Sequence, residues 1–544
     1  MTLESFNFAD VWEAVSDTVG DRVAVVCRDR SVTYAELESR SNRLAHVLQR
    51  LGVTEGDHVG VHLMNCIEYF EAMFACFKIR AVPININYRY VSAELDHLIA
   101  DSQAVALISH RNLSDRLAGL ASLAGLPILT VAPPLPDLEL PDPLPGALDY
   151  ELECAKESEV RDFAPRSDAD RYVIYTGGTT GLPKGVVWTQ QDAFFACIGG
   201  GDPMRLSGPV EAPAELLDRV IDFPFVSFPL APMMHAAAQW TSLSWLFCGA
   251  QVVMNPGSFD ALETWKAIER EKVSTLIVVG DAMVRPLVDA WDTHGPFDTS
   301  SMFALGSGGA PLTVSLKDRL AEILPHVMVT DGFGSSETGA QGSQRINPGE
   351  NSGGSTRFVA LTDSTMVLDE NLNPVEPGSG VEGRVALRGR IPLGYFNDPE
   401  KSAATFVTVG DARWVLTGDI ATVEADGTIL LLGRGSQTIN TGGEKVFPEE
   451  VEAAAKAHPA VYDAVVVGVP DDRFGQRVCA VVQLVEGSQL TLEDLGEHCR
   501  ATLAGYKVPR ELVMVDLLVR SPVGKPDYRW ALETALAAQP DNAE

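Results

Sequence analysis

The segment Thr176–Lys184 reads TGGTTGLPK and follows three apolar residues, Val173–Tyr175, that are typical of a strand. Its glycines let the backbone turn N–H groups toward an anion, its threonine hydroxyls add donors, and Lys184 adds a positive charge. The pattern predicts a cradle for nucleotide phosphates; the alternative is an ordinary glycine-rich turn after a strand. A Walker A loop is excluded, because that loop needs Gly-Lys-[Ser/Thr] and Lys184 stands between Pro183 and Gly185.

The chain before this loop alternates between strand-like apolar runs and amphipathic stretches with helical spacing. Such strand–helix repetition predicts α/β units built on a largely parallel sheet. The expected strands are Arg22–Cys27, His58–His62, Ala81–Ile86 and Ala104–Ile108, and the expected helices are Thr33–Leu51, Glu68–Ile79 and Ser92–Asp101.

Three later segments interrupt this repetition. Val131–Gly146 is rich in proline and predicts a loop. Asp202–Asp222 combines prolines with acidic residues and predicts a surface insertion. Ser352–Gly394 has short β-rich pieces between turn residues and predicts a small β subdomain.

Beyond residue 433 the pattern becomes that of a small α+β domain. We expect helices at Glu449–Ala457 and Leu490–Leu503, and strands at Val461–Val469, Val478–Val485 and Leu512–Val519. The predicted organisation is a large α/β N-terminal domain with parallel sheets, helices and a small β subdomain over residues 1–433. A hinge over 434–440 and a small α+β C-terminal domain over 441–544 follow.

The formal net charge of −32 argues against nucleic-acid binding and against a polybasic membrane anchor. No apolar run reaches the roughly 18 residues of a transmembrane segment. The N-terminal stretch MTLESFNFADVWEAV is acidic and amphipathic, unlike a signal peptide. The eight scattered cysteines form no CxxC pair and predict reduced thiols. We therefore expect a cytoplasmic enzyme whose anionic ligands are held by local cations and N–H groups.

The segment YTGGTTGLPKGV resembles the signature loop of the adenylate-forming superfamily, which includes acyl-CoA synthetases, peptide-synthetase adenylation domains and luciferases. Other segments resemble further motifs of that superfamily, in the expected order. They are PLAPMMH (Pro229–His235), GSGGAP (Gly306–Pro311), DGFGSSET (Asp331–Thr338), WVLTGDI (Trp414–Ile420), GRGSQTIN (Gly433–Asn440), TGGEKVFPEE (Thr441–Glu450) and RSPVGKPD (Arg520–Asp527).

The resemblance implies a two-step reaction with ATP, Mg²⁺ and coenzyme A as a co-substrate. A carboxylate first attacks the α-phosphorus of ATP to give an acyl-adenylate and pyrophosphate, and a thiol then displaces AMP. Because both reactants of the first step are anions, the site needs cations and N–H donors more than it needs a base. The resemblance also implies that the C-terminal domain is mobile between the two steps.

Individual roles are carried over from the motifs. The implied phosphate-binding residues are Thr176, Gly177, Gly178, Thr179, Thr180 and Lys184. The implied nucleotide contacts are Gly309, Ala310, Phe333 and Gly334. The resemblance further implies that Ser336 donates to the α-phosphate and that Asp419 and Arg434 bind the ribose. The implied catalytic residues are Lys525, which bridges carboxylate and α-phosphate, His235, which lies beside the carboxyl group, and Glu337, which holds Mg²⁺. The implied acyl and coenzyme A contacts are Ala237, Gly308, Gly442, Gly443 and Lys445, and the hinge residue is Gln437.

Four positions depart from the usual motifs. Phe333 replaces a tyrosine and Ser336 a threonine, while Gln437 replaces the charged hinge residue and Asn440 a lysine found in many relatives. The hinge departures weaken any role for the Gln437 and Asn440 side chains. A neutral Gln437 can still absorb a backbone rotation.

The acid is predicted to be bulky and largely apolar. The residues after His235 are Ala236, Ala237 and Ala238, which remove side-chain bulk, and Gly280–Met283 with Gly308–Gly309 are expected to form the other wall. The motif details resemble the bacterial branch that activates steroid side-chain carboxylates and related polycyclic terpenoid acids.

Several alternatives stay open at this point. One alternative is that the acid is a medium- or long-chain fatty acid. Another is that the enzyme performs only one half-reaction, together with a partner or carrier protein. A decayed, non-catalytic binding protein is disfavoured because Lys184, Glu337, Asp419, Arg434 and Lys525 are all present. A light-emitting oxygenase is remote. We also consider a homodimer.

Overall fold

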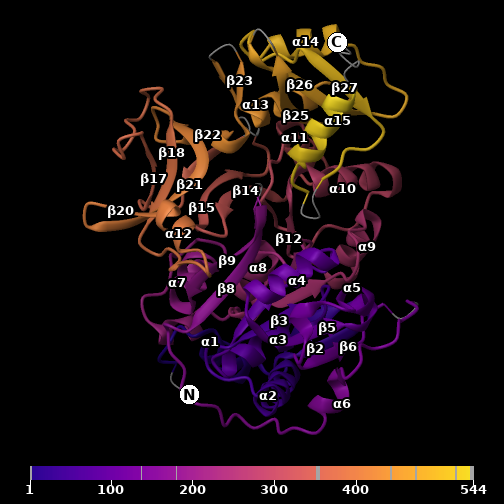
Figure 1. The fold of residues 1–544 in the computed structure, drawn as a ribbon, viewed down its shortest axis with the longest axis vertical. Helices are drawn as coiled ribbons and strands as arrows, with labels where there is room; N and C mark the ends of the chain where they lie inside the picture. Colours follow the sequence, from indigo (N-terminus) through magenta and orange to yellow (C-terminus); the bar gives the residue numbers. More distant parts are fainter. Residues whose placement is uncertain are drawn as a thin grey trace.

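The computed structural model describes residues 3–135, 138–178, 181–350, 356–441, 444–471, 474–520 and 524–538. Figure 1 shows a large domain in indigo to magenta, an antiparallel orange region beside it, and a yellow C-terminal domain above both. The predicted fold class, a large α/β N-terminal domain followed by a small α+β domain, is confirmed.

One parallel sheet of the large domain has the strand order β4-β3-β5-β6-β7. Its strands are β3 (His58–His62), β4 (Val82–Asn85), β5 (Ala104–His110), β6 (Ile128–Val131) and β7 (Leu148–Asp149). The helices of this part of the chain are α1 (Phe8–Val19), α2 (Tyr34–Arg50), α3 (Ile67–Lys78), α4 (Ser92–Asp101), α5 (Ser114–Leu117) and α6 (Tyr150–Cys154), with 3-10 turns η1 (Arg111–Leu113) and η2 (Ala121–Leu123).

The second sheet positions the site. Strands β1, β11, β10, β12, β13 and β14 are parallel, and the antiparallel strands β2 and β15 flank them. Its strands are β1 (Val23–Cys27), β2 (Arg30–Thr33), β10 (Val226–Pro229), β11 (Gln251–Met254), β12 (Thr275–Val278), β13 (Ala304–Gly308), β14 (Met328–Ser335) and β15 (Gly339–Ile346). The associated helices are α7 (Gln190–Ala196), α8 (Ala236–Leu246), α9 (Ala261–Glu271), α10 (Gly280–His294) and α11 (Val314–Ile323), with η3 (Gly199–Gly201) and η4 (Pro213–Arg219).

The described residues of the phosphate-loop segment belong to two antiparallel strands. Strands β8 (Arg171–Gly178) and β9 (Gly181–Thr189) pair antiparallel, and β19 (Gly394–Tyr395) adds to β9. The register shifts between Thr176 and Gly178, opposite Lys184 and Gly181, so Pro183 falls where the ladder is irregular. The expected strand at Val173–Tyr175 is therefore longer than predicted, and Gly181–Lys184 is strand rather than loop.

The small β subdomain and the C-terminal domain complete the chain. The subdomain contains β16 (Arg357–Ala360), β17 (Thr365–Leu368), β18 (Gly383–Arg388), β20 (Phe406–Val409), β21 (Ala412–Val423), β22 (Ile429–Arg434) and α12 (Pro399–Thr405), followed by η5 (Gly435–Gln437). The C-terminal domain contains β23 (Ile439–Thr441), β24 (Glu444–Val446), β25 (Val461–Asp471), β26 (Gly475–Leu484), β27 (Glu511–Val515), α13 (Pro448–Lys456), α14 (Leu492–Arg500) and α15 (Tyr528–Ala537).

The expected elements before the phosphate loop agree with observed ones to within two residues at each end. Helix α2 begins with a capping box, in which the Thr33 hydroxyl accepts from the Glu36 N–H and the Glu36 carboxylate accepts from the Thr33 N–H. The sequence does not predict strand β2, because its residues show no alternation of apolar and polar side chains. In the structure only one of its four residues is buried. Strand β27 ends at Val515, four residues earlier than predicted, before the exposed Leu517.

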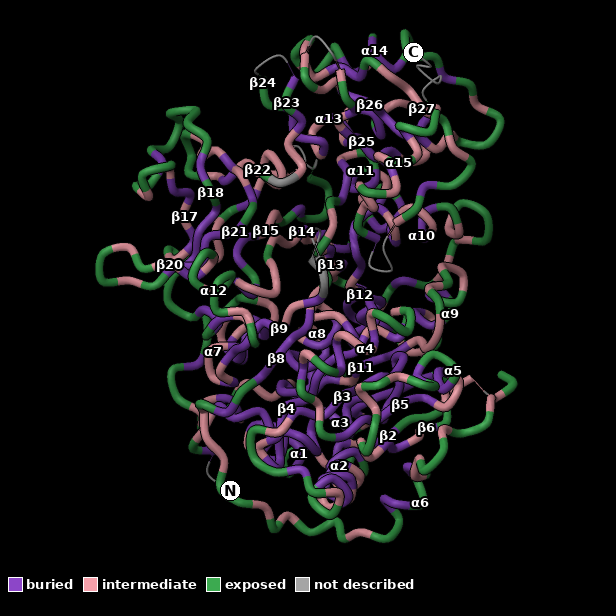
Figure 2. The backbone as a smooth tube through the Cα atoms, viewed as in Figure 1, coloured by how far each residue is buried: buried purple, intermediate pink, exposed green. Residues whose placement is uncertain are grey.

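The predicted surface insertion at residues 202–222 is only partly correct. Much of it is exposed, but Val210 and Leu216 are buried in the main hydrophobic core. Figure 2 shows the core concentrated around the strands of the large domain. Within the described residues, no helix is both long and apolar enough to cross a bilayer.

A buried ion triad ties the first helices together. Lys78, at the end of α3, has a fully buried side chain whose Nζ lies 2.5 Å from Glu13 Oε1 and 2.7 Å from Glu38 Oε1. The Glu38 carboxylate also accepts from Arg161 at 2.6 Å. Because these charged groups are buried, removal of one of them leaves an uncompensated buried charge and destabilises the fold.

Replacing Lys78 with methionine leaves two buried carboxylates without their shared cation. We expect the free energy of unfolding of the large domain to fall by about 3–5 kcal/mol. The matched control is Lys401→Met, because Lys401 is exposed and lies 3.3 Å from Asp398. Chemical denaturation followed by tryptophan fluorescence measures both, and equal effects of the two substitutions would contradict the assignment.

Candidate active site

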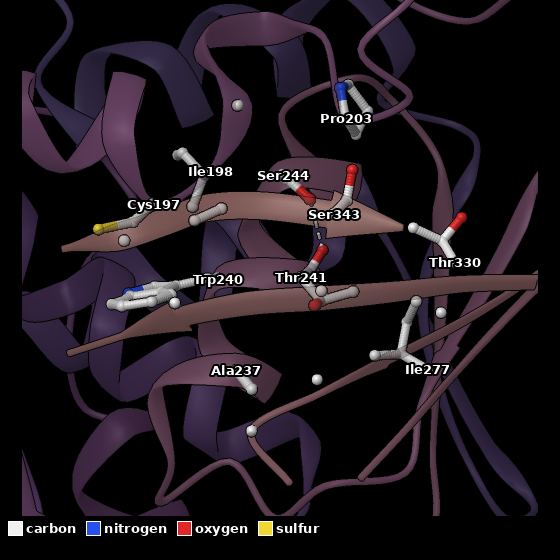
Figure 3. A pocket seen from close by; sticks show the side chains of 18 of the residues that line it. Cys197, Ile198, Pro203, Ala237, Trp240, Thr241, Ser244, Ile277, Thr330 and Ser343 are labelled. Carbon is white, nitrogen blue, oxygen red and sulfur yellow. Dashed lines mark hydrogen bonds between the residues drawn. The ribbon is translucent and has the colours of Figure 1, made fainter. Parts of the chain in front are cut away.

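A cavity of about 600 Å³ lies between helix α8 and the strands β12 to β15. Residues from the 197–206 segment close one side, and Lys525 of the C-terminal domain reaches the cavity from the other domain. Figure 3 shows Cys197, Ile198 and Trp240 on one side of the view and Ile277 and Thr330 on the other, with strands crossing between them. The space is thus built from the large domain and completed by the small one.

The strands present small residues to the cavity. In β13, Ala304, Gly306 and Gly308 line it, while the alternate residues Leu305 and Ser307 are buried on the other face. Strand β14 repeats this alternation, with its cavity-facing residues at positions 328, 330 and 332. Strand β13 therefore supplies a flat part of the wall, while Ile277 of β12 and Met328 and Thr330 of β14 add side chains beside it.

Helix α8 supplies the opposite wall. Its cavity-lining residues recur at helical spacing on one face, and they are Ala236, Ala237, Trp240, Thr241, Ser244 and Trp245. Ala237, which the motifs assign to the acyl pocket, lies in the alanine-rich beginning of this helix and lines the cavity close to His235. The predicted second wall at residues 280–283 is wrong: these described residues do not line the cavity, and Asp281 and Ala282 contact the C-terminal domain instead.

His235 occupies the position before the first residue of α8, makes no capping hydrogen bond with its side chain, and lines the cavity. Its Nε2 atom is buried and has no hydrogen-bond partner among the described residues. Burial, followed by the charges of Lys525 and Arg89, lowers the pKa of His235 to about 3. The imidazole is therefore neutral at physiological pH, and its Nε2 keeps an unused hydrogen-bonding capacity beside the cavity.

Lys525 shares the cavity with His235. Its side chain has accessible surface because it borders the cavity, but protein surrounds it on the other sides. Burial, followed by the charge of Arg434, lowers the pKa of Lys525, and the charges of Glu337 and Asp419 oppose this shift. Two cations and two carboxylates from separate motifs thus influence one another here. A bound anion would relieve the repulsion between Lys525 and Arg434.

Asp419 and Arg434 are cross-strand neighbours on β21 and β22. The Arg434 Nε donates to Asp419 Oδ1 at 3.1 Å. Burial lowers the pKa of Arg434, but Asp419, Glu337 and Glu449 outweigh it and raise the pKa above its ordinary value. The structure therefore brings together the two residues that sequence motifs assigned to the same sugar.

Tyr395 links two predicted site residues and was missed by sequence reasoning. Its hydroxyl donates to Glu337 Oε1 at 2.8 Å, and Lys184 Nζ lies 4.9 Å from the centre of its ring. Burial followed by the Glu337 charge raises the pKa of Tyr395, so its hydroxyl stays a donor. Tyr395 comes from β19, outside every motif, and only the pairing of β19 with β9 reveals its position.

Glu337 was expected to hold Mg²⁺. The described residues contain no cluster of three or more His, Cys, Asp or Glu side chains suited to a metal ion. Mg²⁺ commonly uses one or two carboxylates together with substrate phosphates and waters. Glu337 therefore fits an ion carried by a nucleotide and does not fit a metal cage made by protein alone.

The remaining predicted nucleotide contacts fall into two groups. Thr176, Gly309, Phe333, Gly334 and Ser336 line the cavity. The positive φ of Gly309, 81°, favours glycine at the turn that follows β13. In the second group, Gly177 lies near Tyr90, and Ala310 lies beside the start of α10 without lining the cavity.

Some of the predicted site residues cannot be placed at the cavity. Thr179, Thr180, Gly442 and Gly443 lie outside the described residues, and Gly178 is described only as the last residue of β8. Lys445 is exposed on β24 and does not line the cavity, and Gln437 lies in η5. Their roles stay predictions.

The low pKa of His235 predicts a pH effect on stability. Between pH 6.5 and about 3, His235 is protonated in the unfolded chain but stays neutral in the native protein. The free energy of unfolding therefore decreases as the pH falls through this range. We expect His235→Gln to gain thermal stability relative to the parent as the pH is lowered from 7 toward about 4. Calorimetric Tm values at each pH measure this difference, and a constant difference would contradict a neutral His235.

Comparisons with known proteins agree with this geometry. The AMP-binding enzyme family model matches residues 11–396, and the model of the AMP-binding enzyme C-terminal domain matches residues 450–525. A 3-oxocholest-4-en-26-oate–CoA ligase of Rhodococcus rhodochrous is 47% identical over 534 residues, covering 97% of this chain and 95% of that protein. A medium/long-chain-fatty-acid–CoA/3-oxocholest-4-en-26-oate–CoA ligase of Mycolicibacterium smegmatis is 44% identical over 542 residues, covering 97% and 96%.

Two solved structures share the fold. An anthranilate CoA ligase, AuaEII, in complex with anthranoyl-AMP gives a TM-score of 0.81 at 23% identity, covering 99% of both chains. ATP-bound MatB from Rhodopseudomonas palustris gives 0.80 at 25% identity, covering 97% of this chain and 98% of that one. The motifs, the cavity and these matches together show that the chain belongs to the AMP-binding enzyme family, the adenylate-forming enzymes.

Proposed function

We propose that this chain is an ATP-dependent, AMP-forming acid–CoA ligase that activates a steroid or polycyclic terpenoid acid. The observation that carries the proposal is the small-residue wall of β13, together with a wall from α8 that begins with Ala236 and Ala237 and continues with Trp240 and Trp245. A rigid, wide acid fits between two such walls. Acetate-sized acids would leave most of the 600 Å³ cavity empty.

The length of the cavity supports a long acid. Its lining extends over five residues of each central strand, from Gly308 to Ala304 and from Gly332 to Met328. These four residue-to-residue steps span roughly 13 Å at 3.3 Å per residue. On α8 it extends from Ala236 beyond Ser244, roughly 12 Å at 1.5 Å per residue. The carboxylate end lies near His235 and Lys525, and the remote end lies at the beginnings of the strands.

The cavity contains several hydroxyl groups. Ser244 lines the end of α8 that lies away from His235, and its Oγ donates to the Thr241 carbonyl at 2.8 Å. Figure 3 shows Thr241 and Ser343 near Ser244 in the middle of the view. Thr330 lines the same region. Such groups suit an acid with an oxygen far from its carboxylate, which is the chemistry named for the 3-oxo substrates of the relatives.

The residues suggest how the first step proceeds. Lys525 supplies a positive charge where carboxylate and α-phosphate must approach, and the neutral His235 offers a hydrogen bond at the head of the acyl cavity. The acid's oxygen attacks phosphorus and pyrophosphate leaves. Mg²⁺, held on the nucleotide beside Glu337, would screen the triphosphate charge. The thiolate of coenzyme A then attacks the acyl carbonyl, and AMP leaves.

A medium- or long-chain fatty acid is the second candidate, because one relative is named for such acids as well. A comparison of rates with different acids distinguishes the steroid-acid proposal from the fatty-acid alternative. Thioester formation is measured with a 3-oxo sterol side-chain acid, its 3-deoxy analogue and a medium-chain fatty acid.

We expect kcat/KM for the oxo acid to exceed that for the fatty acid by at least about tenfold, since a pocket that fits an apolar group gains that much. Removing the remote oxygen should cost about fivefold, the value of one hydrogen bond. Activity confined to short linear acids would contradict the proposed substrate class.

Lys525→Ala tests the proposed role of its charge. We expect acid-dependent pyrophosphate exchange to fall at least about a hundredfold, while thioester formation from preformed acyl-adenylate is retained. The control is Arg529→Ala, because the Arg529 side chain is 90% exposed near the same turn. Equal loss of both half-reactions in the Lys525 variant would contradict a role limited to adenylation.

The domain boundaries at 433 and 441, the mobility of the C-terminal domain and the cytoplasmic location stay predictions, and so does the homodimer. Light scattering on the purified chain determines its oligomeric state.

A further inference from the structure

Arg520 is bound to the turn that carries Lys525. Its Nη1 donates to the carbonyl of Gly524 at 2.9 Å, and its backbone forms an antiparallel bridge with Pro526. The bonded carbonyl belongs to the peptide that joins Gly524 to Lys525. Arg520 therefore fixes the direction in which the Lys525 side chain leaves the backbone.

A bidentate ion pair holds the other edge of the Arg520 guanidinium. Nε and Nη2 each lie 2.6 Å from one oxygen of Asp463, on β25. Burial raises the pKa of Asp463, but Arg520 and Lys456 outweigh it and keep the carboxylate ionised, with a pKa below its usual range. Two parallel N–H···O bonds define an orientation as well as a distance, so the guanidinium has little freedom to rotate.

The same network continues into the large domain. Lys456, on α13, has its Nζ 3.9 Å from Asp463 Oδ1 and 3.3 Å from Asp281 Oδ2, on α10. Asp281 is itself fixed, because its Oδ1 accepts from the Thr313 N–H at 2.8 Å. Lys456 and Asp281 have almost completely buried side chains, so solvent screens their attraction little.

The turn also touches α10 directly. Gly524 has a φ of +73°, and a Cβ built there would lie 2.5 Å from the Cβ of Ala282. A second contact lies further along the helix, where Tyr462 donates to Asp289 at 3.1 Å and Arg285 covers its ring at 5.0 Å. Positions 281, 285 and 289 are four residues apart, so one face of α10 carries the whole contact.

We propose that Arg520 is a positioning residue for Lys525 in the adenylation step, and that the Asp281–Lys456 ion pair anchors its partner Asp463 to the large domain. The proposal rests on the proposed function, since it assigns Lys525 to adenylation. Arg520 does not line the cavity, and its proposed role is to set where the ammonium group of Lys525 lies. An Arg520 that served only to stabilise the small domain would affect both half-reactions alike.

The test compares half-reactions in the full-length enzyme. With Arg520→Gln we expect kcat for acid-dependent pyrophosphate exchange to fall about a hundredfold, because a misplacement near 1 Å has that effect. The KM for the acid and thioester formation from preformed acyl-adenylate should each stay within about threefold. Arg520→Lys, which keeps the charge but loses the bidentate fork, should recover part of the lost exchange rate.

The matched control is Arg477→Gln. Arg477 also joins a carboxylate, Glu511 at 2.7 Å, to a backbone carbonyl, that of Pro470 at 2.8 Å, and lies in the same domain. We expect this control to leave pyrophosphate exchange unchanged. Asp281→Asn should reduce the exchange about tenfold, because it weakens the anchor without removing Arg520.

Circular dichroism and Tm show whether each variant is folded. The proposal is overturned if Arg520→Gln lowers both half-reactions equally, if Arg477→Gln lowers exchange to the same extent, or if exchange is unchanged. If the parent enzyme exchanges pyrophosphate with fatty acids but not with sterol acids, the proposed substrate fails, while the Arg520 comparison is made with the fatty acid.

Discussion

Lys525 stands on the small domain, while the cavity that receives it belongs to the large domain. Its ammonium group lies in the field of Arg434, which disfavours both charges, and Glu337 and Asp419 offset part of that repulsion. A carboxylate and a phosphate between these groups would complete the balance. A chain with a net charge of −32 thus keeps a local cationic site for the meeting of two anions.

The two ends of the parallel strands line two different parts of the cavity, one near Lys525 and one away from it. Their carboxyl ends carry Gly308 and Gly332 next to the reacting end, in agreement with the general position of ligand sites in α/β sheets. Their beginnings, with Ala304 and Met328, line the opposite end of the cavity, where we propose that the far end of the acid lies. Changes in the acyl portion can therefore be accommodated without moving Lys525.

Sequence reasoning located residues whose roles depend on short motifs. Asp419 and Arg434 were assigned to one sugar, and their cross-strand pairing places them together. Tyr395 and the bonding of Arg520 could not be predicted, because both depend on contacts between segments far apart in the chain. The assignment of residues 280–283 to the acyl wall failed for the same reason: the docked C-terminal domain, and not the cavity, lies against that part of α10.

The most direct test is to hold the two domains in the arrangement seen here. Cysteines at Asp289 and Tyr462, whose side chains are hydrogen-bonded, can be joined by a short, reducible bis-thiosulfonate linker, and the eight native cysteines are buried. We predict that the linked enzyme forms acyl-adenylate and pyrophosphate but no thioester, and that reduction restores thioester formation. Thioester formation at an undiminished rate while the domains are linked would contradict the account.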